Sequence, residues 1–188
     1  MSQETPLING HYYHIYNRGN NGENLFFEER NYDYFLKLYI HYIYPIADTY
    51  AYCLMKNHFH LLVRINSKTQ DWQSFKDCQS LYSQAFSNMF STYTKTINKN
   101  YNRSGSLFEK PFKRILIDGD SYLVQLVCYI HRNPQKHGFT KDFRTYVYSS
   151  YQTISQQKQS RIESQQVLEW FGSLQSFENY HLQFEDNP

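Results

Sequence analysis

The stretch from Thr49 to Ile65 reads TYAYCLMKNHFHLLVRI, and its pattern is the most informative one in the chain for predicting the fold. Its first half, up to Met55, is rich in aromatic and other strand-favouring side chains. Lys56 and Asn57 form a tight-turn signal, and the half that begins at His58 has the composition of a second strand. We therefore predict an antiparallel β-hairpin here.

The segments on both sides of this hairpin alternate between strand-like and helix-like patterns. Helices are expected where apolar residues recur three and four positions apart, and strands where aromatic and β-branched residues cluster between turn signals. The expected elements are a strand at 11–17, a helix at 28–43, a helix at 73–98, one or two strands within 107–117, a helix at 122–133 and a small helix at 167–171. This order predicts an α+β sandwich, with helices on one face of a mostly antiparallel sheet.

Composition and charge are compatible with a nucleic-acid-binding protein but do not by themselves indicate one. Aromatic residues make up 19% of the chain, and such rings can stack on exposed bases as well as fill a core. The net charge is only +2, but six basic residues lie between Lys95 and Arg114, whereas five acids follow Arg161. A basic middle with an acidic tail suits binding to a polyanion, although charged runs are more often simple solvated surface.

The remaining features predict a cytoplasmic protein. The three cysteines are an odd number and form no C-x-x-C pair, which argues against a disulfide framework. Residues 1–9 do not resemble a signal peptide, and no stretch is long and apolar enough to span a membrane.

His58 and His60 are the first candidates for chemistry. Side chains two positions apart on a strand point to the same face, so both imidazoles could bind one divalent cation, while Phe59 would face the core. An isolated His-x-His pair is more often an ordinary pair of strand residues, and two ligands are too few for a metal. A third ligand would have to come from elsewhere in the chain.

Tyr129 and Asn133 are the second pair of candidates. They lie four residues apart on the helix at 122–133 and therefore share one of its faces, offset from the apolar stripe that begins at Leu123. The amide oxygen of Asn133 is a hard ligand suited to Mg²⁺ or Mn²⁺. The alternative is that Tyr129 packs at the border of the helix and Asn133 ends the helix before Pro134.

These motifs together resemble the single-tyrosine HUH transposase family, which includes short insertion-sequence transposases and REP-associated tyrosine transposases. The string YAYCLMKNHFHLLV at 50–63 is similar to the family's histidine hairpin, with His58-Phe59-His60 as its HUH motif. Four further strings occur in the family's order: YHIYNRG at 13–19, GSLF at 105–108, YL through YIHRNP at 122–134, and YSSY at 148–151. The matches run in order from about residue 11 to residue 151, which is most of the chain.

The resemblance implies a ferredoxin-like sandwich of the HUH endonuclease type and assigns roles to four positions. His58 and His60 would bind a divalent metal ion, with Mg²⁺ and Mn²⁺ as the main candidates. Asn133 would be in the position of the third ligand. Tyr129 would attack a phosphodiester of single-stranded DNA and form a 5′-phosphotyrosine bond, which a 3′ hydroxyl could then resolve by rejoining the strand. Residues 1–151 would be the catalytic domain, and residues 152–188 a Ser/Gln-rich linker and an acidic tail.

The expected partner is single-stranded DNA with hairpins, bound through phosphate and base contacts. Basic residues are candidates for these contacts: Arg18, Lys56, Arg103, Lys110, Lys113, Arg114, Arg132 and Lys136. Two alternatives stay open, a domesticated protein that binds hairpins without cutting them and a metal-dependent phosphodiesterase that uses water in place of Tyr129. Relatives act as dimers or as monomers, so the sequence predicts neither state.

Overall fold

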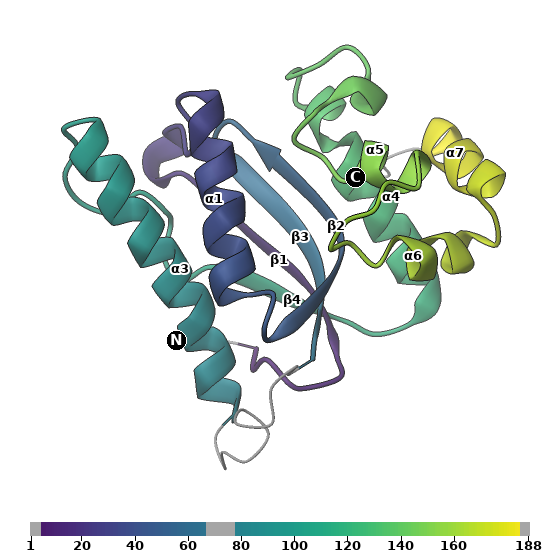
Figure 1. Ribbon diagram of the computed structural model, residues 1–188, viewed down its shortest axis with the longest axis horizontal. Coiled ribbons are helices and arrows are strands. Elements are labelled where there is room, and N and C mark those ends of the chain that lie inside the picture. The colour runs from purple at the N-terminus through teal and green to yellow at the C-terminus, as the bar shows by residue number, and fades with distance from the viewer. Residues whose placement is uncertain (1–4, 67–77, 185–188) are drawn as a thin grey trace.

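The hairpin expected from the sequence is present. Its strands are β2 (Ala47–Met55) and β3 (His58–Ile65), which pair antiparallel across the Lys56–Asn57 turn. This computed structural model describes residues 5–66 and 78–184, and Figure 1 gives its overall arrangement.

The sheet is completed by strands from both sides of the hairpin. Strand β1 (Tyr12–Arg18) pairs with β3, and β4 (Lys113–Ile117) pairs with the other edge of β1. All pairings are antiparallel, and the strand order is β2-β3-β1-β4. With helices after β1 and β3, this is the ferredoxin-like arrangement that the motifs implied. Of the stretch 107–117, only its second half is a strand, since Pro111 has no N–H to donate to a ladder.

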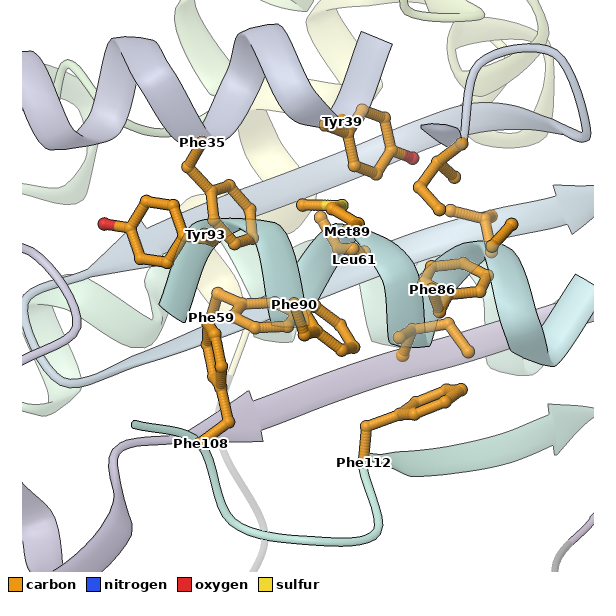
Figure 2. Close-up of a cluster of buried hydrophobic side chains, with 14 of the residues drawn as sticks. Phe35, Tyr39, Phe59, Leu61, Phe86, Met89, Phe90, Tyr93, Phe108 and Phe112 are labelled. Atoms are coloured by element: carbon orange, nitrogen blue, oxygen red, sulfur yellow. The ribbon is translucent and has the colours of Figure 1, made fainter. Parts of the chain in front are cut away.

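One face of the sheet is covered by the helices α1 (Glu29–Tyr42) and α3 (Cys78–Asn100), with the short 3-10 helix η1 (Asn20–Gly22) after β1. Strand residues with odd numbers on β3, such as Phe59 and Leu61, point into this layer, where they pack against the aromatic side chains of the two helices. Figure 2 shows the resulting core of Phe35, Tyr39, Phe59, Leu61, Phe86, Met89, Phe90, Tyr93, Phe108 and Phe112. The expected helix at 73–98 is confirmed from Cys78 onward, and residues 73–77 lie outside the described residues.

The opposite face is covered as well, which corrects the expectation of helices on one face only. Helix α4 (Asp120–Lys136) follows β4 in the chain and lies across this opposite face, as Figure 1 shows. The apolar stripe that includes Leu126 and Ile130 packs against Leu62 and other residues of this face. Even-numbered residues of β3 therefore face α4, and these include both candidate histidines.

Helix α4 also continues through Pro134 and ends at Lys136, with the N–H of His137 bonded to the carbonyl of Asn133 at 3.0 Å. The proposed end of the helix at Asn133 was therefore three residues too early. As a consequence, Asn133 keeps a regular helical position one turn after Tyr129.

The chain from Tyr151 onward forms helices, where a linker and a tail were expected. It forms the helices α5 (Tyr151–Ser155), α6 (Ser164–Phe171) and α7 (Leu174–Gln183), which gather beside α4 in Figure 1. Its few large apolar side chains explain this, because residues such as Phe177 are fully buried in the core on the α4 side of the sheet. The catalytic-domain boundary at 151 stays a prediction, and Glu185 and Asp186 of the acidic tail lie outside the described residues.

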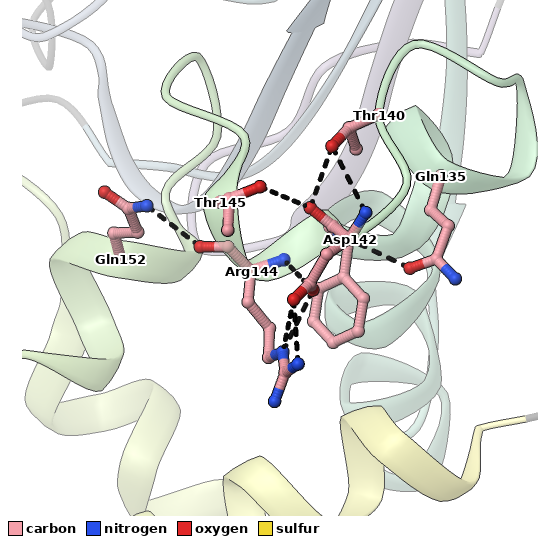
Figure 3. Close-up of polar contacts among 7 residues, drawn as sticks. Gln135, Thr140, Asp142, Arg144, Thr145 and Gln152 are labelled. Atoms are coloured by element: carbon pink, nitrogen blue, oxygen red, sulfur yellow. Dashed lines mark hydrogen bonds and ion pairs between the residues drawn. The ribbon is translucent and has the colours of Figure 1, made fainter.

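The connection from α4 to α5 is held by local polar contacts, which Figure 3 shows around the 3-10 helix η2 (Phe143–Thr145). The carboxylate of Asp142 caps this turn by accepting from the backbone N–H of Arg144 at 3.0 Å and also binds the Arg144 guanidinium. The side chain of Gln135 accepts from the N–H of Phe143, and the side chain of Gln152 donates to the carbonyl of Arg144. No helix in the described ranges has the length and apolar composition of a membrane span.

A buried pair of histidines fixes α7 against α4. Nδ1 of His131 lies 2.8 Å from Nε2 of His181, and Nε2 of His131 lies 2.8 Å from the hydroxyl of Ser150. Arg132, the next residue on α4, donates to the backbone carbonyl of His181 at 2.6 Å. Burial lowers the pKa of His181 to about 4 and that of His131 well below its usual value.

Acidification should therefore destabilise the fold. The unfolded chain takes up a proton on His181 near pH 6.5, whereas the folded chain does so only near pH 4. Stability is thus complete above pH 6.5 and is lost as the pH falls toward 4, by about 2 kcal/mol between pH 7 and pH 5 for this one group. Urea unfolding at the two pH values measures the loss. His181→Gln should reduce the difference and His11→Gln, on an exposed histidine, should not; equal stability at both pH values would contradict the assignment.

Candidate active site

The structure brings Tyr129 to the two strand histidines. His58 and His60 project from β3 toward α4, and their ring centres are 5.4 Å apart. The ring of Tyr129 comes down from α4 and meets the His60 ring edge to face, with the centres 5.5 Å apart at 83°. Residues that are about seventy positions apart in the chain are thus neighbours, because α4 crosses the face of the sheet on which the histidines lie.

Each histidine has one ring nitrogen occupied by a protein partner. Nδ1 of His58 lies 2.7 Å from Oδ1 of Asn57, which can only accept, so the proton of this ring is on Nδ1. Nδ1 of His60 lies 2.8 Å from Nε2 of His14, a buried residue of β1. These contacts orient both rings and leave their Nε2 atoms as the nitrogens that can bind a cation.

The histidines are held in the neutral form that metal binding needs. Burial lowers the pKa of His58 to about 4; nearby His137 adds to the shift and the Asn133 side chain opposes it. Burial also lowers the pKa of His60 well below its usual value, and the neighbouring His14 and His58 add to this. At neutral pH both rings therefore carry a lone pair.

Asn133 is completely buried beside this pair, one helical turn after Tyr129. Its Nδ2 donates to the backbone carbonyl of Tyr129 at 3.1 Å, which fixes the orientation of the amide. Its Oδ1 is buried and forms no hydrogen bond of ordinary geometry with the described residues, although the Asn133 side chain lies close enough to His58 to raise the pKa of that ring. A buried carbonyl oxygen is costly to leave unpaired, so this atom fits the role of a donor to a cation.

The fit of the site to a metal ion depends on this amide oxygen. Among the residues that the structure describes, no three His, Cys, Asp or Glu side chains are grouped so as to hold a metal ion. Two imidazole nitrogens and one amide oxygen are nevertheless a donor set that suits Mn²⁺ and related divalent ions. The residues present are thus compatible with a divalent ion.

A cavity of about 440 Å³, here called the phosphate cavity, opens beside the two histidines and Tyr129, whereas Asn133 is not among its lining residues. It is lined by His58, His60, Tyr129 and two cationic residues, Arg18 at the end of β1 and Lys113 at the start of β4. Arg18 forms an ion pair with Glu109 at 2.6 Å, while Lys113 is exposed. Positive charge in a cavity that is also lined by a tyrosine and two neutral imidazoles suits an anionic substrate.

The eight basic residues predicted to contact DNA do not gather at one place. Lys56 is exposed on the turn of the hairpin, and the ammonium of Lys136 lies 5.5 Å from the centre of the Tyr129 ring. Together with Arg18 and Lys113, these are the candidates on or near the phosphate cavity.

The other four candidates lie apart from it. Lys110 and Arg114 line a separate cavity beside α3, and Arg114 donates to the hydroxyl of Ser83 at 2.6 Å. Arg103 forms an ion pair with Glu23, and Arg132 is engaged with His181 of α7. Their DNA contacts remain predictions, and the protein contacts of Arg103 and Arg132 give these two side chains a structural role.

Three residues of this neighbourhood were not predicted from the sequence: His14, Tyr16 and His137. Tyr16 is paired in register with His60 and stacks on its ring, and the ring centres of His58 and His137 are 4.9 Å apart. The alternation His14-x-Tyr16 on the first strand was a usable signal, but only once β1 is known to pair with β3. His137 follows Asn133 by four residues, so the helical spacing would have found it had α4 been extended past Pro134.

No protein-family model matches the chain. A curated Haemophilus influenzae protein, provisionally named REP-associated tyrosine transposase, is 29% identical to it over 114 residues. The match covers 57% of this chain and 60% of the relative, so the chain spans less than two thirds of the length of that protein.

Among solved structures, a REP-associated tyrosine transposase bound to a REP hairpin has the same fold. It superposes with a TM-score of 0.63, over 86% of this chain and 89% of that one, at 14% sequence identity. Both comparisons agree with the family resemblance drawn from the motifs: the chain is similar in sequence, over part of its length, to one REP-associated tyrosine transposase, and it has the same fold as another.

Proposed function

We propose that this protein cuts and rejoins single-stranded DNA as a transposase, with Tyr129 as the nucleophile and a divalent metal ion as the cofactor. One observation carries the proposal: the Tyr129 ring lies against His60, and the two side chains line one cavity with Arg18 and Lys113. The family relationship supports the same activity.

The chemistry assigned to this chain's residues begins with the Tyr129 hydroxyl. Its oxygen forms a bond to the phosphorus as the bond to the 3′ oxygen breaks, which leaves a 5′-phosphotyrosine and a free 3′ hydroxyl. The phenol loses its proton in this step and the leaving 3′ oxygen gains one, so the exchange is balanced, and the Lys136 ammonium near the ring favours the negative charge that develops on the phenol oxygen. A 3′ hydroxyl reverses the same exchange and rejoins the strand, so no ATP is consumed.

His58, His60 and Asn133 would hold the metal ion, through two Nε2 atoms and the buried Oδ1. When bound, a divalent ion neutralises charge on the phosphate oxygens and makes the phosphorus open to attack. Asn57 and His14 would not contact the metal ion themselves. Asn57 bonds to the His58 ring and His14 to the His60 ring, and these contacts fix the two rings in the required orientation. Mn²⁺ and Mg²⁺ are the ions that we propose.

The proposed partner is DNA that combines a hairpin with a single strand, by analogy with the solved relative that is bound to a REP hairpin. His58, His60 and Tyr129 of one chain already lie together, so a second subunit is not needed to assemble the site. This supports a site that acts in cis, in a monomer or in each subunit of a dimer.

A direct test incubates the protein with single-stranded oligonucleotides that carry hairpins from the DNA flanking its gene, in the presence of Mn²⁺ or Mg²⁺. The expected result is a protein–DNA adduct stable in denaturing gels that retains a label placed 3′ to the cut, because the 5′ phosphate stays on the protein. EDTA should prevent its formation. Hairpin binding without any adduct would replace the proposal by the alternative of a binding protein that does not cut.

Replacing Asn133 by aspartate should tighten Mn²⁺ binding by about tenfold, because a carboxylate is a stronger ligand than an amide. In EDTA the same variant should lose about 1–3 kcal/mol of unfolding free energy, since the new charge is buried without a cation. Mn²⁺ titration and urea unfolding measure the two effects. If Asn133→Asp leaves Mn²⁺ affinity unchanged, the side chain is not a ligand; Asn179→Asp, on an exposed asparagine of α7, is the control.

A further inference from the structure

Tyr129 separates the phosphate cavity from a second and larger cavity of about 690 Å³. This second cavity, here called the aromatic pocket, lies between the β1 and β4 strands, α4 and the C-terminal helix α7. Tyr16, His60 and Tyr129 line both spaces, so the two cavities meet at the proposed nucleophile.

The two cavities differ in their chemistry. Arg18, Lys113 and Glu109 give the phosphate cavity charged walls, whereas no Lys, Arg, Asp or Glu is among the described residues that line the aromatic pocket. Its walls carry aromatic rings and two side-chain amides: Tyr16, Tyr122, Gln125, Tyr129, Tyr180 and Gln183. A volume of this size with mostly apolar walls and a few polar groups is typical of a site for an aromatic ligand.

Several groups of the pocket that could contact a ligand are exposed or form no hydrogen bond with the described residues. Tyr122 is 45% exposed and Tyr180 is 55% exposed, although both are large aromatic residues. The amides of Gln125 and Gln183 make no hydrogen bond to the residues that the structure describes, and amides in such a position can read the polar edge of a base.

The pocket wall formed by α7 is held in place. Arg132 and His131 of α4 bond to His181, which is the residue after Tyr180. The Tyr180 ring also contacts the ring of Phe171, with the centres 5.8 Å apart. Tyr180 is therefore presented toward α4 by a fixed helix, so little ordering is required when a ligand enters.

We propose that the aromatic pocket binds an unpaired nucleobase of the strand that is cut, from a nucleotide next to the scissile phosphate. The phosphate would lie in the charged cavity, and the adjoining base would stack in the aromatic pocket, with Tyr129 between them. Stacking on aromatic side chains is tolerant of base identity, and the two amides add hydrogen bonds to the base edge. This inference rests on the proposed function, because it assigns a base subsite to the same DNA strand.

The test combines a protein variant with modified DNA. Tyr180→Ala should lower kcat/KM for cleavage by about 10- to 100-fold, the loss of one base–aromatic stack, and Tyr180→Phe should restore it. Oligonucleotides with an abasic nucleotide at successive positions around the cut should show the same loss at one position in the wild type. At that position Tyr180→Ala should lose nothing further. Leu182→Ala, on the exposed side of the same helix and outside the pocket, is the matched control.

A binding measurement distinguishes failure of this inference from failure of the proposed function. 2-Aminopurine placed at the same positions should be quenched on binding to wild-type protein and to Tyr129→Phe, and not to Tyr180→Ala. If the wild type forms no adduct but this quenching is seen, the nuclease proposal fails and the base site stands. If adducts form while Tyr180→Ala cuts and quenches as the wild type does, the base site is overturned.

Discussion

Replacing Tyr129 by phenylalanine is expected to abolish the covalent protein–DNA adduct and to lower the rate of strand cleavage by about 10³-fold or more. The substitution removes only the hydroxyl. The ring keeps its edge-to-face contact with His60 and its place under the Lys136 ammonium, so the fold and the cavities should be unchanged. Cleavage of end-labelled oligonucleotides under single-turnover conditions gives the rate, and denaturing gels show the adduct.

The control for this experiment is Tyr148→Phe, which removes a tyrosine hydroxyl on the α1 side of the sheet. The Tyr148 ring stacks on Tyr32 with centres 3.6 Å apart, and phenylalanine keeps this stack. Adduct formation should be the same as in the wild type. Hydrolysis that persists in Tyr129→Phe without any adduct would assign the attack to water, and the protein would then be a metal-dependent phosphodiesterase.

The parts of this site that depend on local periodicity could be predicted from the sequence. A strand has a period of two, so a hairpin at 49–65 places His58 and His60 on one face whatever the rest of the fold is. A helix has a period of 3.6, so Tyr129 and Asn133 share a face in the same way. What brings the two pairs together is the packing of α4 on the sheet, and here the family resemblance, not periodicity, supplied the prediction.

The parts that depend on strand pairing and on distant contacts could not be predicted. His14 reaches His60 only because β1 inserts between β3 and β4, and nothing near His14 in the chain indicates that neighbour. Residues 152–160 are rich in Ser and Gln, which suggested a linker, but Ile154 is fully buried. One well-placed apolar residue per turn is sufficient to hold a short helix against a large core.

The presence of a basic residue in the sequence was similarly a weak guide to contacts with DNA. Arg132 and Lys136 lie one turn apart on α4, and the sequence gives no reason to treat them differently. In the structure, Arg132 binds the carbonyl of His181 and packs over the Phe143 ring, whereas Lys136 lies beside Tyr129. Whether a cation faces a ligand or fastens a helix is decided by tertiary packing.

Replacing His60 by glutamine is expected to weaken Mn²⁺ binding by about 100-fold or more and to lower cleavage to a similar extent. The variant loses the imidazole Nε2 that we propose as a metal ligand. His14→Phe leaves both proposed ligands in place but removes the partner of His60 Nδ1 at 2.8 Å, so its Mn²⁺ affinity should fall by a smaller factor, about 10- to 100-fold. Titration of Mn²⁺ followed by calorimetry or by water-proton relaxation measures both affinities without relying on activity.

The relative size of these losses in Mn²⁺ affinity tests the assignment. A large loss for His60→Gln and a smaller one for His14→Phe would show that His60 binds the ion and that His14 only orients the His60 ring. His41→Gln changes an exposed histidine of α1 and should bind Mn²⁺ as the wild type does. If His60→Gln and His41→Gln bound Mn²⁺ equally well, the ion would not be held at β3, and the neutral state of His58 and His60 would serve packing alone. If His14→Phe were as severe as His60→Gln, the proton partner of the ligand would matter as much as the ligand, and His14 would have to be placed among the groups that contact the cation itself.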